Sequence, residues 1–234
     1  ETPDLDAIIR KLICEEVYAS GSRHLLFCRF KPVSMLLEAF VDARCAPLLE
    51  TCVGPIVADV TVAPVPHFLP GRARSSSLTS AELARNDDSA DSQLEASVLS
   101  WSLRLLDTVT LSAHLVPAAV VGLFVHLRAT MAKQYPDQPA LHVAPVVVVL
   151  LLRYLVRAVA DPAGYGLIDA RPSPGQTRVL RAVARKFRAF ITWFLWRSNP
   201  SLDDLLQPSF EAITSFFSAI SLPSGPLPET PRLD

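Results

Sequence analysis

The stretch that decides the fold is VVVVLLLRYLVRAVADPAGYGLIDARPSP, residues 146–174. Its first half is an almost continuous apolar run, which is typical of a helix buried on most sides. Arg153 and Arg157 interrupt this run, and a guanidinium group among apolar side chains is costly unless it meets a partner, the surface or a functional groove. The second half holds the prolines and glycines that end the helix. These two arginines are therefore the first residues whose role must be explained, and for Arg153 a structural role weighs as much as a functional one.

Helical periodicity continues over most of the chain. The 234 residues are 50% apolar and 19% charged, which is enough for one sizeable core, and 20 prolines against 8 glycines favour helices joined by stiff connections. We expect helices over residues 4–18, 32–52 (restarting at Pro47), 94–109, 117–135, 145–161, 176–196 and 201–220. No convincing strand pair is present, so the sequence predicts a single all-α domain over residues 1–222 and a disordered, Pro-rich tail over 223–234.

Residues 63–93 have a different composition. They are rich in Ser, Pro, Asp and Arg and show little periodicity, which is typical of a flexible polar excursion. The RARSSS segment within it could be phosphorylated, but a solvated loop is the favoured interpretation.

Composition also narrows the class of protein. The net charge of -1 argues against bulk binding to nucleic acid. No signal peptide is visible, and four cysteines without a CxxC pair indicate reduced thiols in a cytoplasmic protein. Thr108–Leu127 is long enough to span a bilayer, but its histidines, Pro117 and Gly122 favour buried helical structure instead. The start at Glu1 is what a domain of a longer chain would show.

The sequence carries no motif of a self-contained enzyme. GxxxxGK[ST], GxGxxG, GxSxG and HExxH are all absent, so neither a cofactor nor a metal is expected. The remaining candidates for a functional role are arginines. They are Arg29 in a short apolar segment, Arg153 in the buried run, and Arg185 on a basic face of the helix over 176–196. This arrangement suits a protein that supplies a cation to a phosphoryl-transfer site on a partner. For Arg178, Arg181 and Arg188 the favoured alternative is a solvated helix face.

Three blocks of sequence resemble a known family. LLFCRFKPVSMLLEAF (25–40), LLRYLVRAVADP (151–162) and AGYGLIDARPSPGQTRVLRAVARKFRAF (163–190) are similar, in order and spacing, to the Ras GTPase-activating (RasGAP) domain and its neurofibromin-like branch. The resemblance implies a multi-helix RasGAP-like fold. It also implies a partner, a Ras-like small GTPase in its GTP-bound state, whose GTP hydrolysis is accelerated by an arginine finger inserted in trans.

The resemblance also assigns roles to individual residues. Arg153 matches the arginine that braces the finger loop, and Glu38 matches the acidic residue of the helix after that loop. Arg185 matches a functional lysine, so it is expected to hold the partner. The finger arginine itself falls on Cys28, which makes Arg29, one residue later, the shifted finger candidate.

Other positions extend or weaken this assignment. Lys31 and Arg181 are further candidates for partner contact. Val156 stands where the family has Asn and Arg157 where it has Pro, so a catalytically weak or inactive pseudo-activator that acts as a GTPase-binding scaffold is the main alternative. A third interpretation has the basic face over 178–188 contact acidic lipid headgroups. No transmembrane span is expected, and membrane association would come through the partner or flanking domains.

Overall fold

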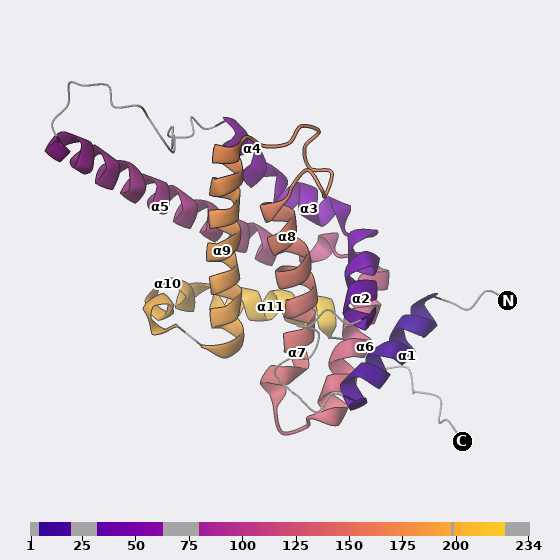
Figure 1. The fold of residues 1–234 in the computed structure, drawn as a ribbon. Helices are drawn as coiled ribbons and strands as arrows, with labels where there is room; N and C mark the ends of the chain where they lie inside the picture. The colour runs from indigo at the N-terminus through magenta and orange to yellow at the C-terminus, as the bar shows by residue number, and fades with distance from the viewer. Residues whose placement is uncertain (1–4, 20–31, 63–79, 198, 223–234) are drawn as a thin grey trace, which may run out of the picture.

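The computed structural model of the chain describes the backbone of residues 5–19, 32–62, 80–197 and 199–222, and the side chains of all of these but 19 and 80–91. Within these ranges every regular element is a helix, which confirms the all-α prediction (Figure 1). The α-helices are α1 (Leu5–Ala19), α2 (Pro32–Asp42), α3 (Ala46–Cys52), α4 (Gly54–Val62), α5 (Ser80–Leu111), α6 (Ala118–Gln134), α7 (Pro139–Val147), α8 (Val156–Ala160), α9 (Pro174–Trp196), α10 (Asp203–Leu206) and α11 (Phe210–Ser221). The other helical segments are η2 (Ala113–Leu115), η3 (Val148–Leu155), η4 (Pro200–Leu202) and η5 (Gln207–Ser209).

The core of the molecule is built around one helical column. α7, η3 and α8 follow one another without interruption, and α9 stands beside them (Figure 1). Every residue from Val146 to Leu151 is buried, as the apolar run predicts. By length and composition alone this column, Pro139–Ala160, is the one described helix that could cross a membrane. Its 18-residue apolar window has a mean hydropathy of 2.1, and 78% of that window is buried within the protein.

The column begins earlier than the sequence predicts. Pro145 was expected to open the helix, but the helix begins at Pro139 and Pro145 lies inside it. Proline has no N–H to donate, so the backbone ladder must adapt around it. Val148 N–H donates to the carbonyls of both Ala144 and Pro145, and η3, which starts at Val148, has the wider π-helical bonding. The end of the column at Asp161 and Pro162 agrees with the prediction.

α9 is amphipathic, as expected, and both of its ends are fixed. Ser173 and Gln176 form a reciprocal capping box at its start, and the Gln176 side chain also donates to the carbonyl of Thr61 at 2.9 Å. Its buried face is apolar throughout. That face consists of Val179, Leu180, Val183, Ala184, Phe187, Phe190, Ile191 and Trp193.

At the other end of α9, Arg197 takes a left-handed conformation, with φ of 48°. Its guanidinium group lies 4.3 Å from the ring centres of both Trp193 and Phe210, a cation–π arrangement that joins α9 to α11. Trp193 Nε1 donates to Asp203 at 2.6 Å, so the buried indole N–H has a partner. These contacts explain how the chain turns back after α9.

Two predicted helices have different limits in the structure. α5 begins at Ser80 rather than at Leu94, so residues 80–93 are helical and not an irregular excursion; residues 63–79 lie outside the described residues, as does the tail. The segment 80–93 lacks an apolar face but contains good helix formers such as Ala, Glu and Leu. The single helix expected over 201–220 is divided into η4, α10, η5 and α11. Pro208 lies in η5, where the division occurs.

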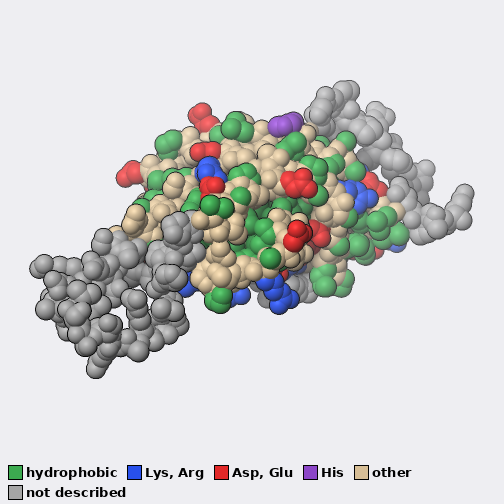
Figure 2. Space-filling view, turned by 90° about the horizontal axis from the view of Figure 1, so that it is seen from above, with side chains coloured by type: hydrophobic (Ala, Val, Ile, Leu, Met, Phe, Trp, Pro, Cys, Tyr) green, Lys and Arg blue, Asp and Glu red, His purple; other side chains and the backbone are tan. Residues whose placement is uncertain are grey.

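The Thr108–Leu127 segment is not one helix. α5 ends at Leu111, a short 3₁₀ turn follows, and α6 begins directly after Pro117, as predicted. Figure 2 shows the molecule from above, where Lys and Arg side chains are interspersed with acidic and apolar ones. This mixture is in keeping with the net charge of -1.

Candidate functional site

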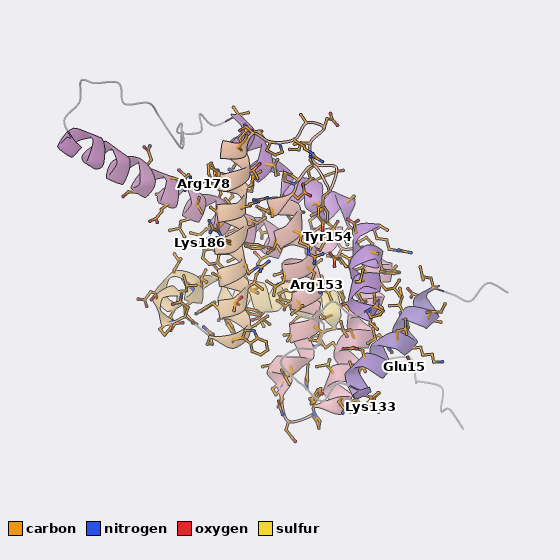
Figure 3. All side chains as sticks on the ribbon, viewed as in Figure 1. Glu15, Lys133, Arg153, Tyr154, Arg178 and Lys186 are labelled. Carbon is orange, nitrogen blue, oxygen red and sulfur yellow. The ribbon has the colours of Figure 1, made fainter. Side chains whose placement is uncertain are left out.

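The two arginines of the central column bind one carboxylate. Arg153 lies in η3 and Arg157 in α8, four residues apart, so both face α2. Arg153 Nη2 donates to Glu38 Oε2 at 3.0 Å, and Arg157 Nη1 donates to Glu38 Oε1. Each oxygen of Glu38 therefore accepts from a different guanidinium group. Figure 3 labels Arg153 on the central column.

The three side chains differ in exposure, which decides how much each contact contributes. The exposed fractions are 7% for the Arg153 side chain, 15% for Glu38 and 36% for Arg157. Removing one partner of a buried ion pair lowers the stability of the fold strongly, because the remaining charge is left without compensation in a poorly solvated site. Water screens a partly exposed pair, which contributes less. The Arg153–Glu38 pair is thus the stronger constraint on how α2 sits against the column.

Two tyrosines lie beside this ion cluster. Tyr154 is fully buried and its ring packs edge-on against Tyr165 with ring centres 5.9 Å apart. Burial raises the pKa of Tyr154, and it also raises that of Tyr165, where the negative charge of Glu38 adds to the effect. Both phenols are therefore neutral at physiological pH. The Tyr154 hydroxyl has no hydrogen-bond partner within the described part of the chain.

The residues expected at the finger lie outside the described residues. These are Cys28, Arg29 and Lys31. Arg153 is described, and it donates to Glu38 on α2, the helix that begins at Pro32 directly after that segment. With its side chain only 7% exposed, Arg153 is not available to touch another protein. Through its contact with Glu38, Arg153 can brace the chain by fixing α2.

The predicted partner-binding residues Arg181 and Arg185 lie on α9 with two further arginines. Arg178, Arg181, Arg185 and Arg188 are all exposed, and Figure 3 labels Arg178 on this helix. No ion pair is formed by Arg181, Arg185 or Arg188 with any described residue. The structure therefore places Arg181 and Arg185 at the surface and Arg153 in the interior, so these three do not form one site.

Hollows run along this face of α9. The larger, of about 700 Å³, lies between α9 and the turn over residues 161–173, and it has both Arg171 and Arg181 and both Asp161 and Asp169 in its lining. A smaller one, of about 370 Å³, is lined by Pro172, Pro174, Thr177, Arg178, Arg181 and Arg185. The charged residues that line the smaller hollow are all arginines, so it is the one suited to an anionic or acidic partner.

The sequence did not predict one cluster that the structure forms. His126 Nε2 on α6 lies 3.6 Å from Cys14 Sγ on α1 and 3.3 Å from the carbonyl oxygen of Arg10. Burial lowers the pKa of His126, so its imidazole is neutral at pH 7. Cys14 and His126 are 112 residues apart in the sequence. The signal that the sequence offered was the spacing of Arg10 and Cys14, which are four residues apart and so share one face of α1. Among the described residues no group of three or more His, Cys, Asp or Glu side chains could hold a metal ion.

Comparison with known proteins adds no relative. No protein-family model matches the chain, and no curated protein matches it. The functional argument therefore depends on the residues and contacts described above.

The difference in burial between the two arginines predicts a difference in stability. Arg153→Met should lower the free energy of unfolding by about 3 kcal/mol, because it breaks a buried pair, whereas Arg157→Met should lower it by about 1 kcal/mol or less. Urea denaturation followed by circular dichroism measures both. Equal losses for the two variants would contradict the assignment of Arg153 as the stronger constraint.

Cysteine reactivity is a second test of the described structure. Burial raises the pKa of Cys45 to about 12 and that of Cys52 to about 11, so at pH 8 only about 10⁻⁴ and 10⁻³ of these thiols are ionised. Cys14 is only partly buried. Iodoacetamide at pH 8 should label Cys14 well before Cys45 and Cys52, as followed by peptide mass mapping. In guanidinium chloride the three rates should converge; labelling of Cys45 or Cys52 as fast as Cys14 in the native protein would show that the burial is wrong.

Proposed function

We propose that this domain binds a Ras-like small GTPase in its GTP-bound state and accelerates GTP hydrolysis by inserting Arg29 in trans. The observation that supports the proposal is the Arg153–Glu38 ion pair, because the resemblance to the RasGAP domain assigns Arg153 a bracing role. A finger of this kind stabilises the negative charge that develops on the transferred phosphoryl group, and it contributes about 10³ to 10⁵ in turnover.

The pair could position the finger through α2. Glu38 lies six residues after the start of α2 at Pro32, which is about 9 Å along the helix axis. Fixing Glu38 against the column fixes the direction in which the chain enters α2, and Arg29 precedes that entry by three residues. Such control matters, since a misplacement of about 1 Å at a catalytic group can cost on the order of 100-fold in rate.

The remaining contacts of the complex would come from basic side chains. Arg181 and Arg185 lie at the surface of α9 without ion-pair partners among the described residues, and with Lys31 they form the proposed contact to an acidic surface of the GTPase. The nucleotide and its metal ion belong to the GTPase, so the domain needs no cofactor of its own. The proposed location is the cytoplasm, with any membrane contact made through the GTPase or flanking domains.

A second function, binding without acceleration, is favoured by one specific contact. Arg157, which stands where the RasGAP domain has proline, occupies the second oxygen of Glu38. Together with Cys28 at the finger position, this departure fits a scaffold that holds the GTPase in its GTP-bound state. In that case the docking surface would be kept and the chemistry lost.

The proposal is tested by GTP hydrolysis in a panel of Ras-like GTPases with and without the domain. We expect acceleration by the unaltered domain, a loss of about 10³-fold or more in Arg29→Ala, and little change in Arg188→Gln, which alters an exposed arginine outside the proposed contact. Absence of acceleration by the unaltered domain would refute the catalytic claim. Binding to the GTP-bound form that persists in that case, with activity gained in Cys28→Arg, would support the scaffold instead.

A further inference from the structure

The described residues that line one groove on α9 include three arginines and no carboxylate. We call it the arginine groove; its lining consists of Pro172, Pro174, Thr177, Arg178, Arg181 and Arg185. The three arginines follow one another at i+3 and i+4, so they share one face of the helix. Arg178 and Arg185 are seven residues apart, which is about 10 Å along the axis.

Two of the three charges in the groove have no counter-charge among the described residues. Arg181 and Arg185 form neither an ion pair nor a hydrogen bond with any residue that the structure describes. Asp161 and Asp169 line the neighbouring hollow with Arg181, and Glu95 lines another with Arg185, but none of these carboxylates comes within 4.0 Å of either guanidinium group. Like charges this close on a helix repel one another, and a bound anion would relieve that repulsion.

The wall of the groove is held rigidly. Pro172 and Pro174 have fixed φ angles, and Ser173 between them is held by its capping box with Gln176. Thr177 is anchored as well, since its amide donates to the Ser173 carbonyl at 2.8 Å and its hydroxyl to the Pro172 carbonyl at 3.4 Å. A ligand would therefore meet a preformed wall and would need to order only the arginine side chains, which lowers the entropic cost of binding.

We propose that the arginine groove binds a polyphosphorylated inositol, either as the free ring or as a lipid headgroup. Guanidinium groups form paired, charge-assisted hydrogen bonds with phosphate oxygens. A volume of about 370 Å³ lies within the range of small-ligand sites, and a ring with phosphates at several corners can reach arginines spread over about 10 Å. The inference does not depend on the proposed GTPase contact, although both use Arg181 and Arg185, so the two ligands would compete.

The test is calorimetric titration with inositol hexakisphosphate near 150 mM salt. Arg181→Gln combined with Arg185→Gln should weaken binding by about thirtyfold or more, because each lost charge-assisted contact is worth severalfold to tenfold or more. Lys186→Gln combined with Arg188→Gln is the matched control, since it removes the same charge from exposed positions on the same helix that do not line the groove. This control should change the affinity by less than about threefold. No binding by the unaltered domain, or equal losses in both double variants, would overturn the proposal.

Vesicles distinguish the two sources of the ligand. The domain is sedimented with phosphatidylcholine vesicles that contain either a phosphoinositide bisphosphate or phosphatidylserine at equal total charge. Binding that prefers the phosphoinositide and is lost in the Arg181 and Arg185 double variant identifies the headgroup. Binding to the soluble ring without this preference identifies the free inositol phosphate. If the domain binds phosphatidylserine vesicles as well as it binds the phosphoinositide vesicles and the soluble ring, the attraction is one of non-specific charge, and the proposal is refuted.

Discussion

One largely buried carboxylate ties the first half of this protein to the second. Glu38 on α2 accepts from Arg153 and Arg157, which come from a helical column more than a hundred residues later. A guanidinium group in an apolar core needs a charged partner, and here both arginines find the same one. The orientation of α2 on the column is therefore fixed by directional, charge-assisted bonds in addition to apolar contacts, which alone would tolerate sliding.

The same cluster extends toward the surface that we propose is functional. Beyond Arg157, the Tyr165 ring packs against Tyr154 of the column, and Tyr165 belongs to the turn that separates α8 from α9. That turn also supplies Asp161 and Arg171 to the larger hollow on α9. One buried cluster thus lies between the helix after the proposed finger and the wall of the basic face, so it can set the relative position of both.

The sequence predicted the features that arise from local periodicity. The apolar run at 146–151, the amphipathic pattern of α9 and the helix start after Pro117 all followed from spacing, and the cost of burying Arg153 indicated that it must have a role. The start of α5 was missed because a helix that is polar all round has no apolar stripe to recognise. The helix over Pro145 was missed because π-helical bonding adapts the column to a proline that normally ends a helix.

Contacts between distant residues were beyond local reasoning. The sequence indicated that Arg157 is costly in an apolar run and departs from the RasGAP domain, but it did not predict that Arg157 shares Glu38 with Arg153. The pairing of Cys14 with His126 depends on how α1 packs on α6 and leaves only a weak trace in the sequence. The resemblance did assign Arg153 and Glu38 to one region, but it did not predict that they bind each other.

A double-mutant cycle on Glu38 and Arg153 tests the central claim most directly. The free energy of unfolding is measured for the unaltered protein, Glu38→Gln, Arg153→Met and the double variant. If the buried pair fixes α2 on the column, the loss in the double variant should fall short of the sum of the single losses by about 1.5 kcal/mol or more. Losses that add to within about 0.5 kcal/mol would mean that the two side chains act independently and would contradict the account.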